Sequence, residues 1–296
     1  MELQILLQLS ITGLAWGSVY ACLALGFVLI AKATDVFNFA MPEFMMMGAY
    51  MAFTVITYLK LPFVLGFIAA MVIMGIVAAL LEMSVVRPLI GEHVFSILMV
   101  TIGLASVLRG LTGLIWGYEE LQLPTPFPRA PLLVGGVAIK QTELYTILAT
   151  AALLVVFLLF FKRSAAGISM RATAEDTLTA FLMGIDVHRV FTGSWVLASM
   201  VSTVAGIFLA SFTFLEPIMS FTGLKALPAI ILGGMNSVEG AIVGGLIIGL
   251  VENLAEFYLE EYFGSGIQDI AAYVIVLIAM MIRPYGLFGT RRVERV

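Results

Sequence analysis

The sequence predicts an all-α integral membrane protein, a polytopic helical bundle of about eight or nine membrane segments with broken helices. Of its 296 residues, 61% are hydrophobic and 11% are charged, whereas soluble domains carry roughly 25% charged residues. The apolar residues form long uncharged blocks, and a helix needs roughly 20 mostly apolar residues to cross the hydrocarbon core. These blocks lack the alternation typical of barrel strands, and backbone groups in lipid must bond internally, so we expect helices.

The uncharged blocks define nine expected segments within a single transmembrane domain, 1–296. They lie at about 5–31, 43–59, 62–84, 94–117, 143–161, 190–214, 224–236, 240–256 and 267–283. The seventh is too short to span, because its helix would cover only about 20 Å at roughly 1.5 Å per residue. We therefore expect it to be half of a broken helix or a re-entrant segment. Two long loops separate the others: the proline-rich loop 118–142 and the charge-rich loop 162–189.

Lysine and arginine placement predicts the orientation. If loop 162–189 faces the cytoplasm, ten of these residues lie inside, namely Lys32, Arg87, Lys162, Arg163, Arg171, Arg189, Arg283, Arg291, Arg292 and Arg295. Four lie outside: Lys60, Arg129, Lys140 and Lys225. This bias predicts an external N-terminus, a cytoplasmic C-terminus and an external loop 118–142.

No catalytic constellation is visible in the sequence. The only histidines, His93 and His188, fall in loops, and no HExxH, GxSxG or P-loop pattern occurs. The single cysteine, Cys22, can form no internal disulfide. We therefore expect a chain that is not an enzyme and holds no metal or nucleotide. Its role would be to pass a solute, driven by a partner or a gradient.

The segment 171–185 predicts a short amphipathic helix on the cytoplasmic face. Thr173 could cap it with Asp176 three residues on, and Gly184 could end it. Leu178, Phe181 and Leu182 would form its apolar side. Two interpretations stay open: a helix resting on lipid, or a docking element for a partner protein.

Polar residues and glycines interrupt the apolar pattern twice, once in each half of the chain. Transporters often build their solute path from such broken helices. We predict that the two interruptions face each other near mid-membrane and line or gate the path. The residues expected to do so are Asn38, Met41, Glu43, Gly233, Gly234, Asn236 and Ser237. The alternative is that each interruption is a solvated turn.

Three further charges, Glu82, Arg109 and Glu252, lie in or near the expected segments. A charge inside the membrane suggests a function, but each of these could also lie near a helix end and reach the interface. The sequence leaves their roles open.

Five stretches resemble the branched-chain amino acid (Liv-type) permeases of ATP-binding-cassette importers, and together they cover essentially the whole chain. They are the coupling-loop stretch 167–185, Asn38-Phe-Ala40 with Glu43 and Gly48-Ala-Tyr50, Arg87-Pro88, the glycine-rich stretch 228–245, and Tyr285-Gly-Leu-Phe-Gly289. One departure is Met41-Pro42, which stands where the family usually has His-Gly. Proline suits the first turn of a helix, but the loss of histidine leaves the exact solute open.

The resemblance implies a permease subunit that moves amino acids, branched-chain or related small amphipathic solutes, across the bacterial cytoplasmic (inner) membrane. It implies four partners: a second Liv-type permease subunit, two ATPase subunits that bind ATP-Mg, and an external solute-binding protein. The ATPase-coupling residues would be Arg171, Thr173, Ala174, Glu175, Asp176, Ala180, Met183 and Gly184. A sequence pI of about 5.2 argues against nucleic acid. The alternative function is a gradient-driven secondary transporter or channel without ATPase subunits.

Overall fold

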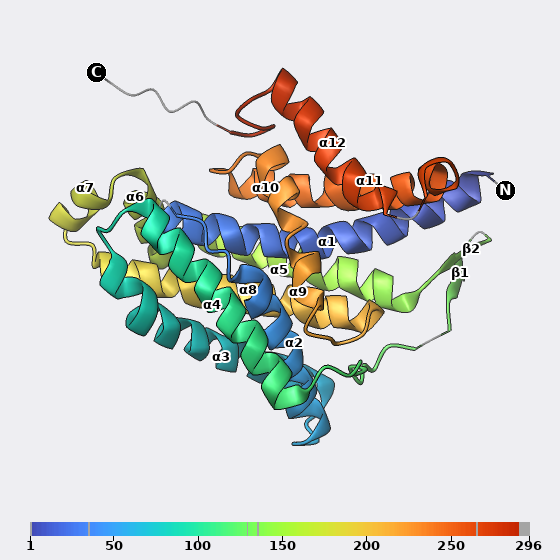
Figure 1. The fold of residues 1–296 in the computed structure, drawn as a ribbon, viewed down its shortest axis with the longest axis horizontal. Coiled ribbons are helices and arrows are strands. Elements are labelled where there is room, and N and C mark those ends of the chain that lie inside the picture. Colours follow the sequence, from blue (N-terminus) through green and yellow to red (C-terminus); the bar gives the residue numbers. More distant parts are fainter. Residues whose placement is uncertain (1, 35, 129, 135, 265, 290–296) are drawn as a thin grey trace.

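The computed structural model describes residues 2–34, 36–128, 130–134, 136–264 and 266–289 as a helical bundle with one small hairpin (Figure 1). The first half contains α1 (Glu2–Thr34), α2 (Met41–Thr57), α3 (Phe63–Leu81), the π-turn η1 (Glu82–Val86), the 3₁₀ turn η2 (Arg87–Leu89) and α4 (Val94–Trp116). The antiparallel strands β1 (Leu132–Val134) and β2 (Val137–Ile139) follow. The rest comprises α5 (Gln141–Arg163), α6 (Ala165–Glu175), α7 (Thr177–Leu182), α8 (Val187–Phe212), α9 (Met219–Gly223), α10 (Ala226–Gly233), α11 (Val238–Phe263) and α12 (Ile267–Ile282).

The predicted fold class is confirmed. Six helices of the described chain are long and apolar enough to cross a membrane: α1, α3 with its η1 and η2 extension, α4, α5, α8 and α11. Two shorter apolar stretches, Met219–Gly233 and Ile267–Ile282, complete the set. Each of the nine predicted segments overlaps a helix. The largest differences concern the seventh, where helix begins earlier at Met219, and the eighth, where α11 continues to Phe263.

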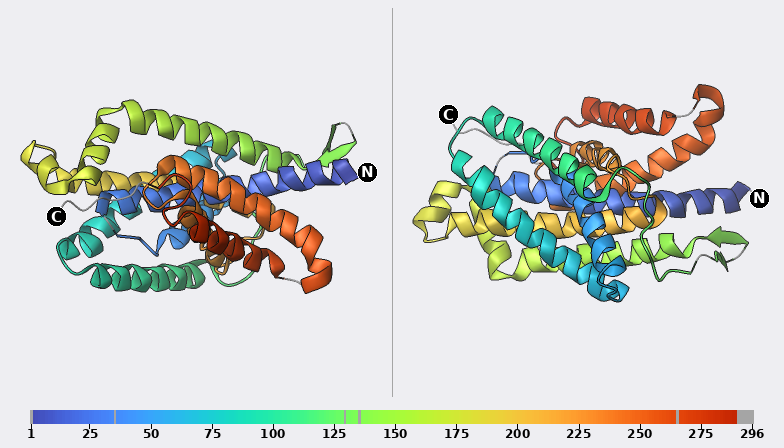
Figure 2. Two further views of the ribbon diagram at one scale, coloured as in Figure 1. Left: turned by 90° about the horizontal axis from the view of Figure 1, so that it is seen from above. Right: turned by 60° about the horizontal axis from the view of Figure 1, so that its bottom comes forward.

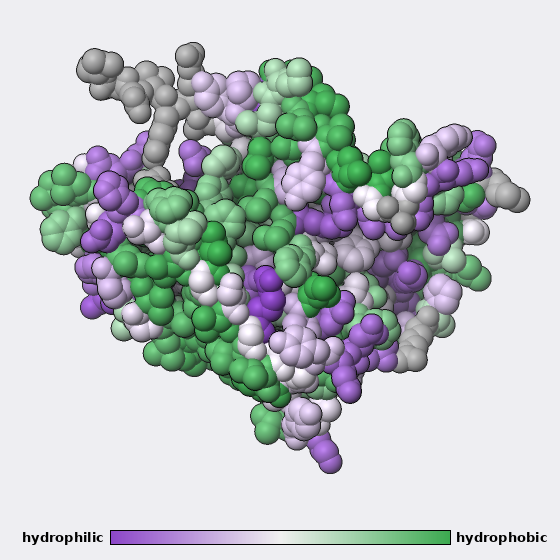
Figure 3. All heavy atoms as spheres, in the orientation of Figure 1, coloured by the Kyte–Doolittle hydropathy of each residue, from purple (hydrophilic) through white to green (hydrophobic). Residues whose placement is uncertain are grey.

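The bundle is layered around two central helices, α1 and α8. In their most apolar windows 89% and 72% of the residues are buried, against 28%, 22% and 28% for α3, α4 and α5. The outer helices expose large apolar side chains such as Ile76, Leu114 and Val156. Figure 3 shows hydrophobic side chains over the outer helices α3, α4 and α12, and many hydrophilic ones toward the hairpin end. Because lipid would cover these apolar side chains, the protein needs few charged residues on its surface.

Glycines allow the central helices to pack backbone against backbone. A Cβ built on Gly17 in α1 would lie 2.8 Å from the Cα and 2.9 Å from the carbonyl oxygen of Leu246 in α11. Gly245 and Gly249 in α11 approach α1 even more closely. In lipid, where no hydrophobic effect drives helices together, close van der Waals packing of this kind stabilises the bundle.

The two halves of the bundle repeat one arrangement. In α1–α4 and again in α8–α12, a long central helix is followed by an extended segment, a short helix, a long helix and an outer helix. The packing partners correspond: α1 packs on α11 as α8 packs on α3, and α2 packs on α3 and α4 as α10 packs on α11 and α12. The halves are therefore structural repeats.

The two repeats run in opposite directions. The chain starts beside the β-hairpin, and α1 runs from there toward the end that carries α6 and α7, whereas α8 runs back toward the hairpin end (Figures 1 and 2). Such inverted repeats are a frequent architecture of membrane transporters. The predicted basic residues Arg129, Arg291, Arg292 and Arg295 lie outside the described residues.

We predict that Gly17→Ala destabilises the protein, whereas Gly103→Ala in α4 does not. Overpacking a tight contact costs typically about 1–3 kcal/mol, and no atom lies within 4 Å of a Cβ built on Gly103. At an open helical position alanine is favoured over glycine by about 1 kcal/mol. Thermal unfolding of the purified variants in detergent measures both effects. Equal melting temperatures for the two variants would show that the α1–α11 contact is looser than described.

Candidate functional site

The first break lies between α1 and α2, where the chain turns back into the bundle. Asn38 is buried, and its Oδ1 accepts a hydrogen bond from the Ala40 backbone N–H at 2.9 Å. The Phe39 N–H donates to Thr101 Oγ1 of α4 at 3.3 Å. Helix α2 then begins at Met41, with Pro42 in its first turn, where the missing N–H of proline costs nothing. A helix therefore starts inside the bundle with its first backbone groups satisfied.

A buried carboxylate marks the start of α2. Glu43 forms an ion pair with Arg109 of α4, and the side chains are 2% and 33% exposed. The Arg109 guanidinium also lies 4.2 Å from the ring centroid of Phe221 in α9, a cation–π contact. Among the described residues, Glu43 Oε2 and Arg109 Nε have no hydrogen-bond partner. Three helices, α2, α4 and α9, thus meet at one ion pair, and within the described chain two of its polar atoms have no hydrogen-bond partner.

The second break lies between α8 and α9. The chain leaves α8 at Phe212, and Leu215 pairs through its backbone with Leu121, with N–O distances of 2.8 and 3.0 Å. It then re-enters as the short helices α9 and α10. Gly223 at the end of α9 packs on α2, because a Cβ there would lie 2.9 Å from Pro42 Cβ. Therefore α9 is the element that faces the first break.

Lys225 sits between α9 and α10 and holds this second half-helix in place. Its Nζ lies 2.6 Å from Asp269 Oδ1 of α12 and 3.6 Å from Glu252 Oε2 of α11. The hydroxyl of Tyr20 in α1 donates to the same Glu252 oxygen at 2.8 Å. Lys225 thus lies in a turn inside the bundle, and the expectation that it is on the outer side of the membrane stays a prediction. Glu252 belongs to an interhelical cluster and does not reach the interface alone.

The predicted second interruption does not face the first, so this part of the prediction is wrong. Gly233 and Gly234 end α10 and pack on the C-terminal segment, with backbone hydrogen bonds from Leu287 to Leu232 and from Phe288 to Gly233, both 2.9 Å. Asn236 is exposed in the turn to α11, and Ser237 caps that helix by accepting from Gly240 N–H. The glycines here allow α10 and α11 to pack closely and allow the chain to turn tightly between them.

Two short helices, not one, occupy the predicted coupling segment. Ser164 caps α6, accepting from Gly167 N–H at 2.9 Å, and Asp176 caps α7, accepting from Thr179 N–H at 2.8 Å. Thr173 is therefore no cap; it lies buried inside α6. Gly184 follows α7 with a φ of 85°, as predicted for a terminating glycine.

The coupling residues differ in exposure. Glu175, Asp176, Met183 and Gly184 are exposed, Arg171 and Ala174 are half-buried, and Thr173 and Ala180 are buried. The Arg171 guanidinium donates to the Lys162 carbonyl at 3.3 Å. The outer side of α7 presents the exposed apolar side chains Leu178, Phe181, Leu182 and Met183.

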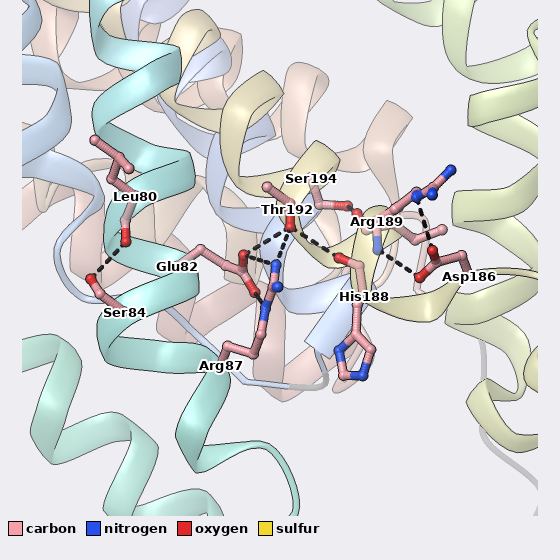
Figure 4. A network of polar contacts seen from close by, with 10 residues as sticks. Leu80, Glu82, Ser84, Arg87, Asp186, His188, Arg189, Thr192 and Ser194 are labelled. Carbon is pink, nitrogen blue, oxygen red and sulfur yellow. Dashed lines mark hydrogen bonds and ion pairs between the residues drawn. The ribbon is translucent and has the colours of Figure 1, made fainter.

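A polar network joins the end of α3 to the start of α8 close to α7 (Figure 4). Arg87 pairs with Glu82 through two hydrogen bonds of 3.2 and 2.7 Å, and its Nη2 lies 2.6 Å from Thr192 Oγ1. Thr192 Oγ1 lies 2.8 Å from Glu82 Oε2 and 3.0 Å from the His188 carbonyl. Glu82 begins the π-turn η1, which places its carboxylate toward α8. The role of Glu82 is thus to join two helices.

Three contributors to these sites were missed from the sequence: Phe221, Lys225 and Trp195. Phe221 and Trp195 stand in apolar runs, where they look like ordinary core. Lys225 carried a usable signal, because a lysine between two apolar stretches, following Glu216-Pro217, is typical of a broken helix.

Inverted repeats, each with a helix that starts inside the bundle, define a polytopic membrane transport protein. The chain belongs to the family described as branched-chain amino acid transport system / permease component, whose family model matches residues 9–284. The predicted Liv-type resemblance is confirmed. The chain is thus the permease component of such a transport system, a transport subunit and not the catalytic one.

Individual relatives agree with the family assignment. The chain is 29% identical to the high-affinity branched-chain amino acid transport system permease protein LivH of Escherichia coli, over 98% of this chain and 97% of LivH. It is equally identical to BraD of Pseudomonas aeruginosa, over 98% of both chains. Among solved structures, PsaBC from Streptococcus pneumoniae in complex with Fab matches with a TM-score of 0.52 at 18% identity, covering 95% of this chain and 92% of that chain. The last similarity shows a shared fold.

We predict that Arg109→Met destabilises the protein by about 1–3 kcal/mol, because it leaves the buried Glu43 carboxylate without a partner. Adding Glu43→Gln should restore much of the loss, since removing both charges removes the penalty. Arg189→Met is the matched control: Arg189 is 89% exposed in its pair with Asp186, and such pairs contribute little. Chemical denaturation in detergent measures all variants. A double variant no more stable than Arg109→Met would contradict the ion pair.

Proposed function

We propose that this permease works in an ATP-driven importer of branched-chain or related small amphipathic amino acids in a bacterial cytoplasmic membrane. The hairpin end faces outward and receives solute from an external binding protein. The α6–α7 end faces the cytoplasm and contacts two ATPase subunits, which bind ATP-Mg. A second Liv-type permease completes the membrane part. The printed names of LivH and BraD support the substrate class.

The observation that carries this proposal is the outer side of α7. Four large apolar side chains, Leu178, Phe181, Leu182 and Met183, are 64–80% exposed. Helix α7 has six residues and projects at the end of the bundle (Figure 1), and hydrophobic side chains gather there (Figure 3). A helix lying on lipid would run along the bundle side at the interface. An apolar cluster at the tip suits a protein partner, which favours docking over the lipid interpretation.

We assign the solute path to the region where α2, α4 and α9 meet. Asn38, Met41 and Glu43 start the half-helix there, and the Arg109–Glu43 pair keeps unpartnered polar atoms among the described residues. One cation and one carboxylate complement the two charges of an amino acid. Gly233, Gly234, Asn236 and Ser237 remain a prediction for the path, one that their packing on the C-terminal segment and in the turn to α11 does not favour.

The hairpin end offers a place for solute delivery. A cavity of about 510 Å³ lies there, lined by 122–125, 127 and 128, by Lys140, Gln141 and Thr142, and by 210–214 at and just after the end of α8. The prolines of loop 118–142 restrict its backbone, and the Leu121–Leu215 backbone pair ties it to the second break. A binding protein seated on this loop would thus touch a segment continuous with α9.

We predict that Leu182→Glu abolishes ATPase association and solute uptake while the permease stays folded. The substitution puts a charge into the apolar docking cluster. Leu133→Glu in β1 is the control for ATPase association, because Leu133 is 76% exposed at the opposite end of the bundle. Co-purification with the ATPase subunits and uptake by reconstituted vesicles provide the measurements. Normal ATPase binding by Leu182→Glu would refute the assignment of α7 as the docking element.

We predict that single cysteines at Glu120 and Arg163 label from opposite sides of the membrane in a Cys22→Ala background. Helix α5 has 23 residues and therefore spans about 35 Å; its start shares the outer cavity with Gln122, and Arg163 ends it. An impermeant thiol reagent should reach the cysteine at 120 from outside intact cells and the cysteine at 163 only after permeabilisation. The reverse result would invert the proposed orientation.

A further inference from the structure

A cavity of about 240 Å³ lies beside the first break, on its α7 side. Its walls come from the end of α1, the segment 36–38, the loop between η2 and α4, the first half of α4, helix α7 at Thr177, and α8. Pockets for drug-sized ligands measure roughly 300–1,000 Å³, so this cavity suits a smaller solute.

Two buried hydrogen-bond donors in its wall lack an acceptor. The side chains of Asn38 and Trp195 are 1% and 2% exposed, and both residues line the cavity. Asn38 Nδ2 and Trp195 Nε1 have no hydrogen-bond partner in the part of the chain that the structure describes. Leaving a buried donor unsatisfied costs about 1–3 kcal/mol, so an acceptor that enters the cavity and reaches these two nitrogens recovers that cost.

The orientation of both donors is set by contacts outside the cavity. Asn38 Oδ1 is engaged by the Ala40 N–H at 2.9 Å, which leaves the amide nitrogen as the free group. The Trp195 ring packs edge-on against Phe44 of α2, with centroids 6.0 Å apart. The donors are thus pre-organised, which lowers the entropic cost of binding.

The remaining wall complements the other parts of an apolar amino acid. Ile30, Ile97 and Phe191 supply apolar surface from α1, α4 and α8, and the exposed carboxylate of Glu92 contributes the single acidic group. The cavity thus combines donors that suit a carboxylate, a carboxylate that suits an ammonium group, and an apolar surface that suits a side chain. An inorganic cation could not accept hydrogen bonds from the two donors. A neutral sugar would leave the apolar wall without a matching group.

We propose that this cavity is an inner binding site for a zwitterionic apolar amino acid, with the Asn38 and Trp195 N–H groups donating to its carboxylate. This proposal rests on the proposed function. It adds a second binding site to the solute path, between the Arg109–Glu43 pair and the α7 end. Because Thr177 of α7 forms part of the wall, any displacement of α7 changes the shape of the site. The site therefore lies where ATPase motion can release the solute.

The test measures binding of radiolabelled leucine to the purified, nucleotide-free permease–ATPase complex. Leucinamide, which replaces the carboxylate with a neutral amide, should compete at least tenfold more weakly than leucine. Trp195→Phe keeps an aromatic side chain, smaller than the indole, and removes the donor, and should weaken leucine binding about tenfold or more. Asn38→Asp keeps the oxygen that holds Ala40 but replaces the amide donor with a negative charge, and should weaken it further.

Trp116→Phe is the matched control. It removes a tryptophan N–H that donates to Thr54 Oγ1 at 2.7 Å, away from the cavity, and should bind leucine like the unmodified protein. A protein with Trp16 and Trp116 both replaced by phenylalanine retains Trp195 as its one tryptophan. Leucine, and not leucinamide, should shift its emission, which tests the site even where a variant fails to fold.

Leucine affinity within twofold of the unmodified protein in both Trp195→Phe and Asn38→Asp would overturn the proposal, as would equal competition by leucinamide or an unchanged Trp195 emission. Failure of the proposed function looks different: reconstituted complex would then show no ATP-dependent uptake of leucine, isoleucine or valine. Uptake that persists with unaltered affinity in both variants rejects the inner site and leaves the importer assignment intact.

Discussion

A helix that begins inside a lipid-embedded bundle exposes backbone N–H groups that lipid cannot satisfy, and much of this structure answers that constraint. At the first break, the Asn38 side chain and Thr101 Oγ1 accept from the Ala40 and Phe39 N–H groups. At the second, Leu215 pairs with Leu121 before the chain re-enters. The first break is largely buried, with Val36, Asn38 and Ala40 at 5% exposure or less, whereas the second exposes Phe214 and Ile218 at 51% and 60%.

Charge holds the half-helices in place in both repeats, with opposite signs. In the first, the short helix contributes the carboxylate of Glu43 and the outer helix α4 contributes the cation of Arg109. In the second, the turn between α9 and α10 contributes the cation of Lys225, and α11 and α12 contribute two carboxylates. Both groups bring opposite charges together, which lowers the high cost of a lone charge in the membrane. Arg109 and Glu252, whose roles the sequence left open, therefore help to position the half-helices.

The sequence predicted those features that depend on bulk hydrophobicity and on local chemistry. The uncharged blocks located the helices, and Asn38, Pro42 and Glu43 located the first break. The second break was missed because its polar signal is weak, with Glu216-Pro217 and Lys225 scattered in an apolar run, while the stronger signal at 233–240 belongs to a helix turn. The cap at Asp176 was assigned to Thr173, since both fit a capping pattern and only the fold decides between them. Trp195 and Phe221 look apolar in sequence, and their contacts, with Phe44 of α2 and Arg109 of α4, depend on helices distant in the chain.

The network at the α3–α8 junction has a mechanical consequence. Helix α7 is joined to α8 by a short turn containing Gly184, and one turn into α8 Thr192 is bound to Glu82 and Arg87. The start of α8 and the end of α3, including the π-turn that carries Glu82, are therefore held to each other by side-chain bonds. A force applied to α7 would reach α8 through this short turn, and the bonds to Glu82 and Arg87 would make α3 share the load.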